Sequence, residues 1–221
     1  MHGAASFVAR YRIGTAQHLM PIGARECDRT QEFFARVIRE ERIARGRKAL
    51  IISSFAAAAA MLPFERALIE MGLIVCNSEA SPYDGARTEA TIRRFDIALV
   101  APVSGVALDA IAAAGFDAAI LFRGKIVWAK PDAYARLQNI DGIDLRRWIE
   151  IGPVTAIEAK QGGGALIDGR EWTLEPEGLT TFVTSRLDRA TRFNRLRVPV
   201  ALSLNRHEFQ ATLPGPRVIV A

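Results

Sequence analysis

The chain has 221 residues, of which half are hydrophobic and about a quarter are charged, and this composition is typical of a folded protein rather than a disordered one. Its net charge of +5 and pI near 9.7 favour polyanionic partners. The two cysteines form no CxxC pair and the three histidines are scattered, which argues against a structural zinc site and a disulfide framework. We therefore expect a reducing, cytoplasmic setting.

The two longest apolar runs do not have the character of membrane spans. Residues 49–62 are too few to cross a bilayer and include two serines. Residues 97–115 are interrupted by a serine, a glycine and an aspartate. Since the N-terminus also lacks a continuous apolar segment, we expect neither a membrane span nor a secretory signal.

The first predicted element is a helix from Asp28 to Gly46. Asp28 and Gln31 have the spacing of a capping box, apolar residues then recur at helical spacing, and Gly46 is a natural stop. Arginines along this helix alternate with glutamates, which indicates a solvated face. We assign residues 1–47 to an N-terminal helical segment.

The second segment, residues 48–130, alternates short apolar strands with helices. The predicted strands are 49–53, 73–76, 96–101 and 118–122, and the predicted helices are 56–71, 86–94 and 106–114. This alternation predicts the α/β class with a largely parallel sheet. We further expect the turn Arg123–Gly124 to join 118–122 to 125–129 as a hairpin.

The third segment, residues 131–221, has a mixed α+β texture. A short helix is predicted at 131–140 and a longer one at 179–195, and strands are predicted in 148–160, 165–167, 171–174, 198–204, 209–213 and 218–220. The helix at 179–195 would direct several arginines away from its apolar face. Such a flank can contact phosphates, or it can simply be a solvated face. The residues are Arg189, Arg192 and Arg195 on the helix and Arg197, which follows it.

The most informative motif is Ile157-Glu158-Ala159-Lys160, which ends an apolar run and precedes a glycine-rich stretch. Glu158 and Lys160 lie two residues apart and so point to the same face of a strand. In metal-dependent phosphodiester cleavage a carboxylate holds Mg²⁺ and a lysine orients or activates the attacking water. The alternative is a surface ion pair on an edge strand.

A magnesium site at Glu158 needs a further carboxylate, because one carboxylate rarely holds Mg²⁺. Asp144 is the best candidate, fourteen residues earlier and within reach through the turn at Gly152–Pro153. Glu150 is a second candidate and Asp96 a third. The hypothesis requires the carboxylates to lie roughly 4–6 Å apart.

Residues 143–175 resemble the core of the restriction-endonuclease-like nucleases, nearest to their nuclease-related-domain branch. The likeness is carried by Gly152–Pro153, Ile157–Lys160, Gly164, Asp168–Gly169 and Trp172. The resemblance implies that Asp144 and Glu158 are metal ligands and that Lys160 orients the water. Our leading hypothesis is therefore a nucleic-acid-binding protein that hydrolyses phosphodiester bonds with Mg²⁺, although the sequence leaves open whether the chain is catalytic.

Two other classes of function remain open. Parallel α/β sheets bind ligands at the carboxyl ends of their strands, which here carry Ser53–Ser54, Asn77–Glu79 and Pro102–Gly105. These ends could hold a nucleotide or a small anion, even though the sequence contains no GxGxxG or Walker motif. The third class is a noncatalytic interaction or regulatory protein in which Glu158 and Lys160 are only surface residues.

Overall fold

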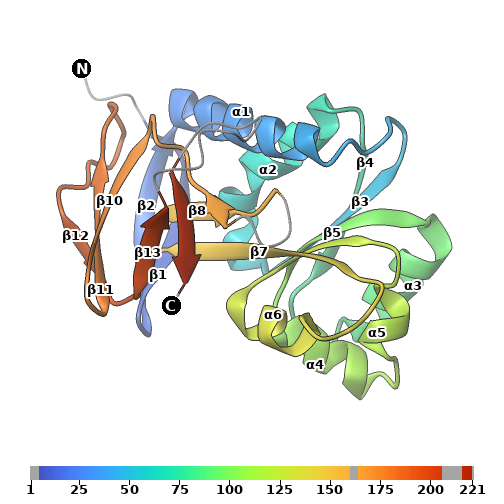
Figure 1. Cartoon of the computed structure of the whole chain (residues 1–221). Coiled ribbons are helices and arrows are strands. Elements are labelled where there is room, and N and C mark those ends of the chain that lie inside the picture. Colours follow the sequence, from blue (N-terminus) through green and yellow to red (C-terminus); the bar gives the residue numbers. More distant parts are fainter. Residues whose placement is uncertain (1–4, 160–163, 206–215, 221) are drawn as a thin grey trace.

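The computed structural model describes residues 5–159, 164–205 and 216–220, and its main feature is a nine-stranded sheet in the order β13-β14-β9-β8-β7-β6-β5-β3-β4 (Figure 1). The strands of this sheet are β3 (Lys48–Ser53), β4 (Ile74–Glu79), β5 (Ile97–Val103), β6 (Ile126–Ala129), β7 (Asp144–Ile151), β8 (Val154–Ile157), β9 (Ala165–Leu166), β13 (Leu202–Asn205) and β14 (Arg217–Val220).

The sheet changes from parallel to antiparallel at β7. Strands β4, β3, β5, β6 and β7 run parallel, whereas β8, β9, β14 and β13 continue the sheet by antiparallel pairing. The first half of β7, residues 144–147, pairs with β6, and its second half, residues 148–151, pairs with β8. This one strand therefore carries the junction between the two halves.

Helices cover both faces of the parallel half, as Figure 1 shows. On one face lie α1 (Ala24–Glu40) and α2 (Ala58–Glu70), the latter preceded by the 3-10 turn η1 (Phe55–Ala57). On the other face lie α3 (Gly85–Phe95), α4 (Gly105–Ala113), the four-residue α5 (Ala118–Leu121) and α6 (Pro131–Leu137). Alternate residues of β3 and β5 enter the two opposite cores, so the buried stretches of both strands are apolar.

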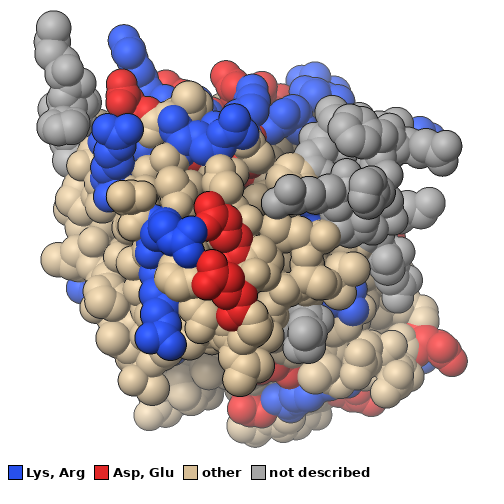
Figure 2. Space-filling model, turned by 60° about the vertical axis from the view of Figure 1, so that its left-hand side comes forward, with Lys and Arg blue, Asp and Glu red and all other residues tan. Residues whose placement is uncertain are grey.

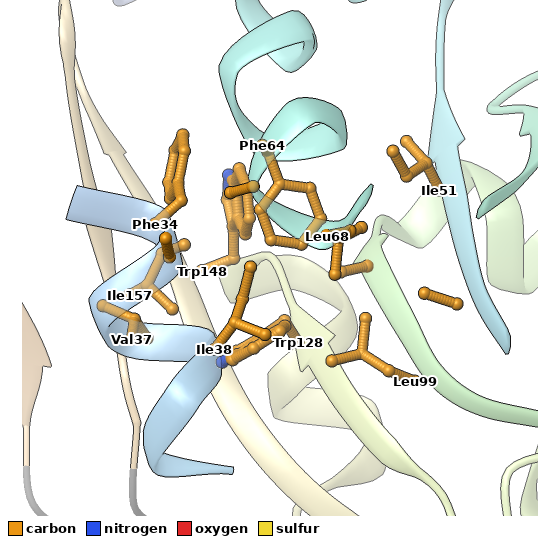
Figure 3. Packing of buried hydrophobic residues seen from close by; sticks show 14 of the residues in the cluster. Phe34, Val37, Ile38, Ile51, Phe64, Leu68, Leu99, Trp128, Trp148 and Ile157 are labelled. Atoms are coloured by element: carbon orange, nitrogen blue, oxygen red, sulfur yellow. The ribbon is translucent and has the colours of Figure 1, made fainter. Parts of the chain in front are cut away.

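Aromatic side chains fill the core beneath α1 and α2. Trp128 of β6 and Trp148 of β7 point toward these helices, and Phe34 and Phe64 pack onto them (Figure 3). Phe64 makes edge contacts with both indoles, at ring-centroid distances of 5.9 Å and 5.2 Å, and Phe34 stacks on Trp148 at 5.8 Å. Such contacts add to the free energy gained by burying the rings.

Two smaller β structures pack beside the antiparallel half of the sheet. The hairpin β1 (Ala5–Ile13) and β2 (Ala16–Gly23) precedes α1, and a three-stranded sheet contains β10 (Trp172–Glu177), β11 (Thr180–Ser185) and β12 (Leu196–Val198). Side chains from both structures and from the main sheet form a common apolar core.

The predicted parallel α/β segment is confirmed in class and in most of its elements, but the N-terminus differs from the prediction. Residues 1–47 contain the hairpin β1–β2, whose two-residue loop places Gly14 at a φ of +58°. Alternating side chains in β1 were a signal for it that we missed. Helix α1 also begins earlier than predicted, at Ala24, where the Gly23 N–H donates to Glu26 Oε1 at 3.2 Å.

The predicted strand at 118–122 and its hairpin are wrong. The segment forms α5, because the Asp117 carboxylate accepts the Ala119 N–H at 2.8 Å and so caps a helix. Strand β6 then pairs in parallel with β5 and β7 instead of forming a hairpin.

The predicted helix at 179–195 is also wrong. Gly178, at a φ of +59°, and Leu179 form the loop of the hairpin β10–β11. The β-branched residues that follow form β11, which buries Thr181 and Val183 on one side. The predicted strand at 209–213 lies outside the described residues.

The expected boundary near residue 130 falls between β6 and β7, two strands that pair directly. The division into 48–130 and 131–221 therefore remains a prediction about folding units. Within the described residues, no helix combines the length and the apolar character needed to cross a membrane.

We predict that Phe64→Ala lowers the free energy of unfolding by about 3–5 kcal/mol, because it empties the space between the two indoles. Urea unfolding followed by tryptophan fluorescence measures this loss. Phe55→Ala is the matched control: Phe55 is 89% exposed, so its loss should change stability by less than about 0.5 kcal/mol. Equal losses in the two variants would contradict this account of the core.

Candidate functional site

Glu158 follows β8, is fully buried and is held by Arg147. Its carboxylate accepts the Arg147 backbone N–H at 3.0 Å and lies 3.3 Å from the Arg147 guanidinium, which stacks on Tyr134. The Glu158 carbonyl accepts the Trp128 indole N–H at 2.6 Å. Glu158 is thus engaged through both its side chain and its backbone.

Asp144, at the start of β7, is engaged by Arg146, which donates to both of its carboxylate oxygens. Arg146 also lies 3.3 Å from Glu41, at the end of α1. The backbone of Asp144 is three residues from Arg147, or about 10 Å along the strand. The structure therefore pairs Asp144 with Arg146 and Glu158 with Arg147.

The other candidate ligands also have cationic partners. Glu150 pairs with Lys130 at 2.7 Å, and Asp96 pairs with Arg47 at 3.5 Å. Lys160 lies outside the described residues. Across residues 5–159, 164–205 and 216–220, no group of three or more acidic, cysteine or histidine side chains is placed to hold a metal ion.

The three arginines expected on the helix at 179–195, and Arg197 after it, lie in different environments. Arg189 is almost fully buried, stacks on Trp172 at 4.0 Å and pairs with Glu26 at 3.1 Å and Glu171 at 2.8 Å. Burial lowers the pKa of Arg189. It therefore ties α1 to the three-stranded sheet and is not available to a phosphate.

Arg192 and Arg197 are exposed, and Arg195 is paired with Glu175 and Glu177 of β10. Figure 2 shows basic and acidic side chains side by side on the face where the three-stranded sheet comes forward. The sheet thus presents mixed charge rather than a continuous basic surface.

The strand ends named as an alternative site do form a pocket. A cavity of about 270 Å³ lies at the carboxyl ends of β3 and β4, and we call it the strand-end pocket. Its chemically distinctive lining residues are Ser53, Ser54, Phe55, Glu65, Asn77, Glu79 and Arg87. Since β5 lies on the side of β3 opposite to β4, the strand order reverses next to this pocket, and such reversal points are where open α/β sheets bind ligands.

Hydrogen bonds within the β4–α3 connection shape one wall of the pocket. Asp84 accepts from the Ser78 hydroxyl at 2.7 Å and from the Glu79 N–H at 2.6 Å. Arg87, in the first turn of α3, donates to the Asn77 carbonyl at 3.2 Å while its side chain remains 65% exposed. The wall is therefore ordered, and a guanidinium stands at its edge.

Sequence reasoning found the serines and Asn77–Glu79 but missed Phe55, Glu65 and Arg87. Phe55 precedes a run of five alanines, and the spacing of apolar residues around it does not indicate that its side chain is exposed. Arg87 could have been found, because a basic residue one turn into the helix that follows a strand end lies near the ligand edge of a parallel sheet.

At the third predicted strand end, that of β5, the polar side chains are used to cap helix α4. The Ser104 hydroxyl accepts the Ala107 N–H at 3.3 Å, and Asp132 accepts the Gly105 N–H at 2.9 Å. A Cβ added at Gly105 would lie 2.6 Å from that carboxylate. These groups hold α4 and α6 together, so the polar side chains at this strand end are already engaged.

No protein-family model and no curated protein matches the sequence, but its fold is similar to solved structures. One is an open conformation of 2-hydroxyisobutyryl-CoA ligase in complex with 2-HIB-AMP and CoA, with a TM-score of 0.70 and 13% identity over 97% of this chain and 56% of that chain. The chain therefore spans about half the length of this ligase.

Two further structures have the same general fold. O-succinylbenzoate coenzyme A synthetase (MenE) from Bacillus subtilis, in complex with AMP, has a TM-score of 0.56 and 10% identity over 100% of this chain and 62% of that chain. MbtA from Mycobacterium smegmatis, in its apo form, has a TM-score of 0.56 and 12% identity over 86% of this chain and 39% of that chain. At these identities the likeness concerns the fold.

These comparisons overturn the nuclease hypothesis. The similar structures include CoA ligases bound to AMP, CoA and acyl adenylates, and not restriction-endonuclease-like nucleases. The resemblance of residues 143–175 to that superfamily is therefore wrong, as are phosphodiester hydrolysis and the nucleic-acid partner. The ligand roles given to Asp144 and Glu158, and the phosphate contacts given to the four arginines, rested on that hypothesis and are not proposed again.

We predict that Glu41 makes stability depend on pH. Burial raises the pKa of its carboxyl from 4.5 to about 7; Arg146 opposes this rise, while Asp144 and Glu158 add to it. Because folding then favours the protonated form, this contribution is present below about pH 4.5 and is lost as pH rises through 7. Its size is on the order of 3 kcal/mol.

The measurement is urea unfolding of the wild type and of Glu41→Gln between pH 4.5 and 8, and the variant should lose much of the decline in stability over this range. Glu40→Gln, at the neighbouring position, is the control and should keep the decline. If the stability of the wild type and of Glu41→Gln declines in parallel with rising pH, Glu41 is not the origin of the decline.

Proposed function

We propose that the chain is an adenylate-binding α/β domain that holds the nucleotide in the strand-end pocket. The observation that carries the proposal is the pocket itself, with a volume of about 270 Å³ next to the point where the strand order reverses. Ligand sites of small-molecule-binding proteins begin at roughly 300 Å³, so the pocket is close to that size.

The lining offers a group for each part of an adenine nucleotide. The exposed Phe55 ring provides a stacking surface for the base. Glu79 and Asn77 provide oxygens that accept hydrogen bonds from ribose hydroxyls. Arg87 provides a guanidinium for the phosphate, with a geometry that suits bidentate contacts to its oxygens.

The fold comparison supports this ligand class. The similar ligase and synthetase structures contain AMP or an acyl adenylate, and they have this fold over at least 96% of the present chain. Since the chain spans about half of the ligase, we propose binding of the adenylate and do not assign the complete ligation reaction to these residues. Mg²⁺ enters the proposal as the ion that accompanies a nucleoside triphosphate, where it is held mainly by phosphate oxygens. The cytoplasmic setting expected from the cysteine content remains a prediction.

We predict that AMP binds the wild-type protein saturably and that Arg87→Ala weakens this binding by about 10- to 100-fold, the effect of losing a charge-assisted hydrogen bond. Isothermal titration calorimetry measures both affinities. Adenosine, which lacks the phosphate, should bind the two proteins alike, whereas Phe55→Ala should weaken AMP and adenosine together.

Arg94→Ala is the matched control, because Arg94 is an exposed arginine on the same helix outside the pocket lining. It should bind AMP like the wild type. If Arg94→Ala weakens AMP as much as Arg87→Ala does, the effect is a general loss of positive charge and the strand-end assignment fails. Absence of a saturable heat with AMP, and with ATP in the presence and absence of Mg²⁺, would overturn the proposed function.

A further inference from the structure

The β1–β2 hairpin, drawn in blue in Figure 1, turns its two faces to different surroundings. Ala9, Met20 and Ile22 point inward and belong to the common apolar core. Side chains alternate along a strand and residues paired across two strands point the same way, so the residues between them form the opposite face. We call it the outer hairpin face, and it consists of Val8, Arg10 and Arg12 of β1 and of Gln17 and Leu19 of β2.

Two apolar side chains on the outer hairpin face are exposed to solvent. Val8 is 51% exposed and Leu19 is 66% exposed. Leu19 lies directly opposite Arg10 in the register of the hairpin, and Val8 is two residues before Arg10 on the same strand. A partner that covers this face would remove both apolar side chains from water, which contributes free energy to binding.

The charge of the outer hairpin face is of one sign. Residues 5–23 contain no aspartate or glutamate. Arg10 and Arg12 are exposed, and within the residues that the structure describes neither forms an ion pair. They differ in this from Arg195 of the three-stranded sheet, which is paired with two glutamates. The outer hairpin face is therefore complementary to an anionic partner.

The arrangement of these side chains favours a protein partner. Helices that lie on membranes keep apolar and charged side chains on different faces, whereas here both kinds share one face. Arg10 and Arg12 are two residues apart on a strand, or about 7 Å. Carboxylates four residues apart on a helix have a similar spacing, about 5–6 Å between their Cβ atoms, and suit bidentate contacts with guanidinium groups. A second copy docked through the same face would instead set arginines against arginines.

We propose that the outer hairpin face binds an acidic amphipathic helix of a partner protein, with carboxylates on Arg10 and Arg12 and apolar side chains over Val8 and Leu19. The adenylate assignment concerns the carboxyl ends of β3 and β4 and involves none of these residues. The two proposals therefore stand or fall separately.

The probe is a helical peptide with glutamates at positions i and i+4 and leucines at i+3 and i+7, titrated into the full-length ¹⁵N-labelled protein and followed by amide chemical shifts. Saturable shifts are expected at Val8, Arg10, Arg12 and Leu19. The double variant Arg10→Gln with Arg12→Gln should weaken the peptide about tenfold, the effect of losing two exposed ion pairs. Leu19→Ser should weaken it as well, and because Leu19 is exposed this variant keeps its fold. The same peptide with lysines in place of the glutamates should not bind.

Arg94→Gln with Arg123→Gln is the matched control. It makes the same change of charge at two exposed arginines of the parallel half, which also form no ion pair within the described residues. This variant should bind the peptide like the wild type. The proposal fails if the peptide produces no saturable shifts on the hairpin, if the two double variants weaken it equally, or if the lysine peptide binds as well.

Two other occupants are distinguished by the same protein. Binding of the wild type to phosphatidylglycerol vesicles in place of the peptide, lost in the double variant at Arg10 and Arg12, would assign the outer hairpin face to an anionic lipid surface. Hairpin shifts that follow protein concentration instead of peptide would assign it to a second copy of the chain. Either result rejects the acidic helix as the partner.

Discussion

The pairing of Glu158 with Arg147 and Trp128 is the constraint on which the main sheet depends. Parallel and antiparallel ladders place their hydrogen bonds differently, so a sheet that contains both needs a defined point of change. Here that point is the middle of β7, where β6 ends its pairing and β8 begins. At this point Glu158 contacts residues of both β6 and β7. Its carbonyl accepts the indole N–H of Trp128 in β6, and its carboxylate accepts the backbone N–H of Arg147 in β7. A carboxylate in the core without such partners would cost several kcal/mol.

This junction also explains why the local motif was misleading. A carboxylate at the end of an apolar strand is costly unless it is used or paired, and we interpreted it as a metal ligand. The fold instead supplies Arg147 from the neighbouring strand, a pairing between residues eleven apart that no local pattern reveals. The same holds for Arg189, whose partners Glu26 and Glu171 come from α1 and from the residue before β10. Charge partners distant in sequence are decided by topology.

The parts of the fold that could be predicted are those in which local preference and burial agree. The buried stretches of strands β3 and β5 are apolar and lie between covered faces, so their class and direction followed from the sequence. The prediction failed where a capping residue or a turn decided the structure: Asp117 made a helix of an apolar run, and Gly178 opened a hairpin where a helix was expected. The serines and Asn77 of the strand-end pocket could be predicted, because the carboxyl ends of parallel strands meet at one edge of the sheet. Phe55 and Arg87 depended on the path of the chain after each strand.

Helix α3 lines the strand-end pocket through Arg87 and a second cavity, of about 530 Å³ beside α5, through Glu89, Ile92 and Arg93. One helix of eleven residues thus contributes side chains to cavities at both ends of the parallel sheet. If a ligand in one cavity changes the affinity of the other, the second ligand must change the affinity for the first by the same factor. The amino end of α3 is clamped, because a Cβ at Gly85 would lie only 2.0 Å from the Ala110 carbonyl oxygen of α4. The backbones of α3 and α4 thus meet at a point that only glycine allows, so a shift of α3 caused by a ligand would be shared with α4.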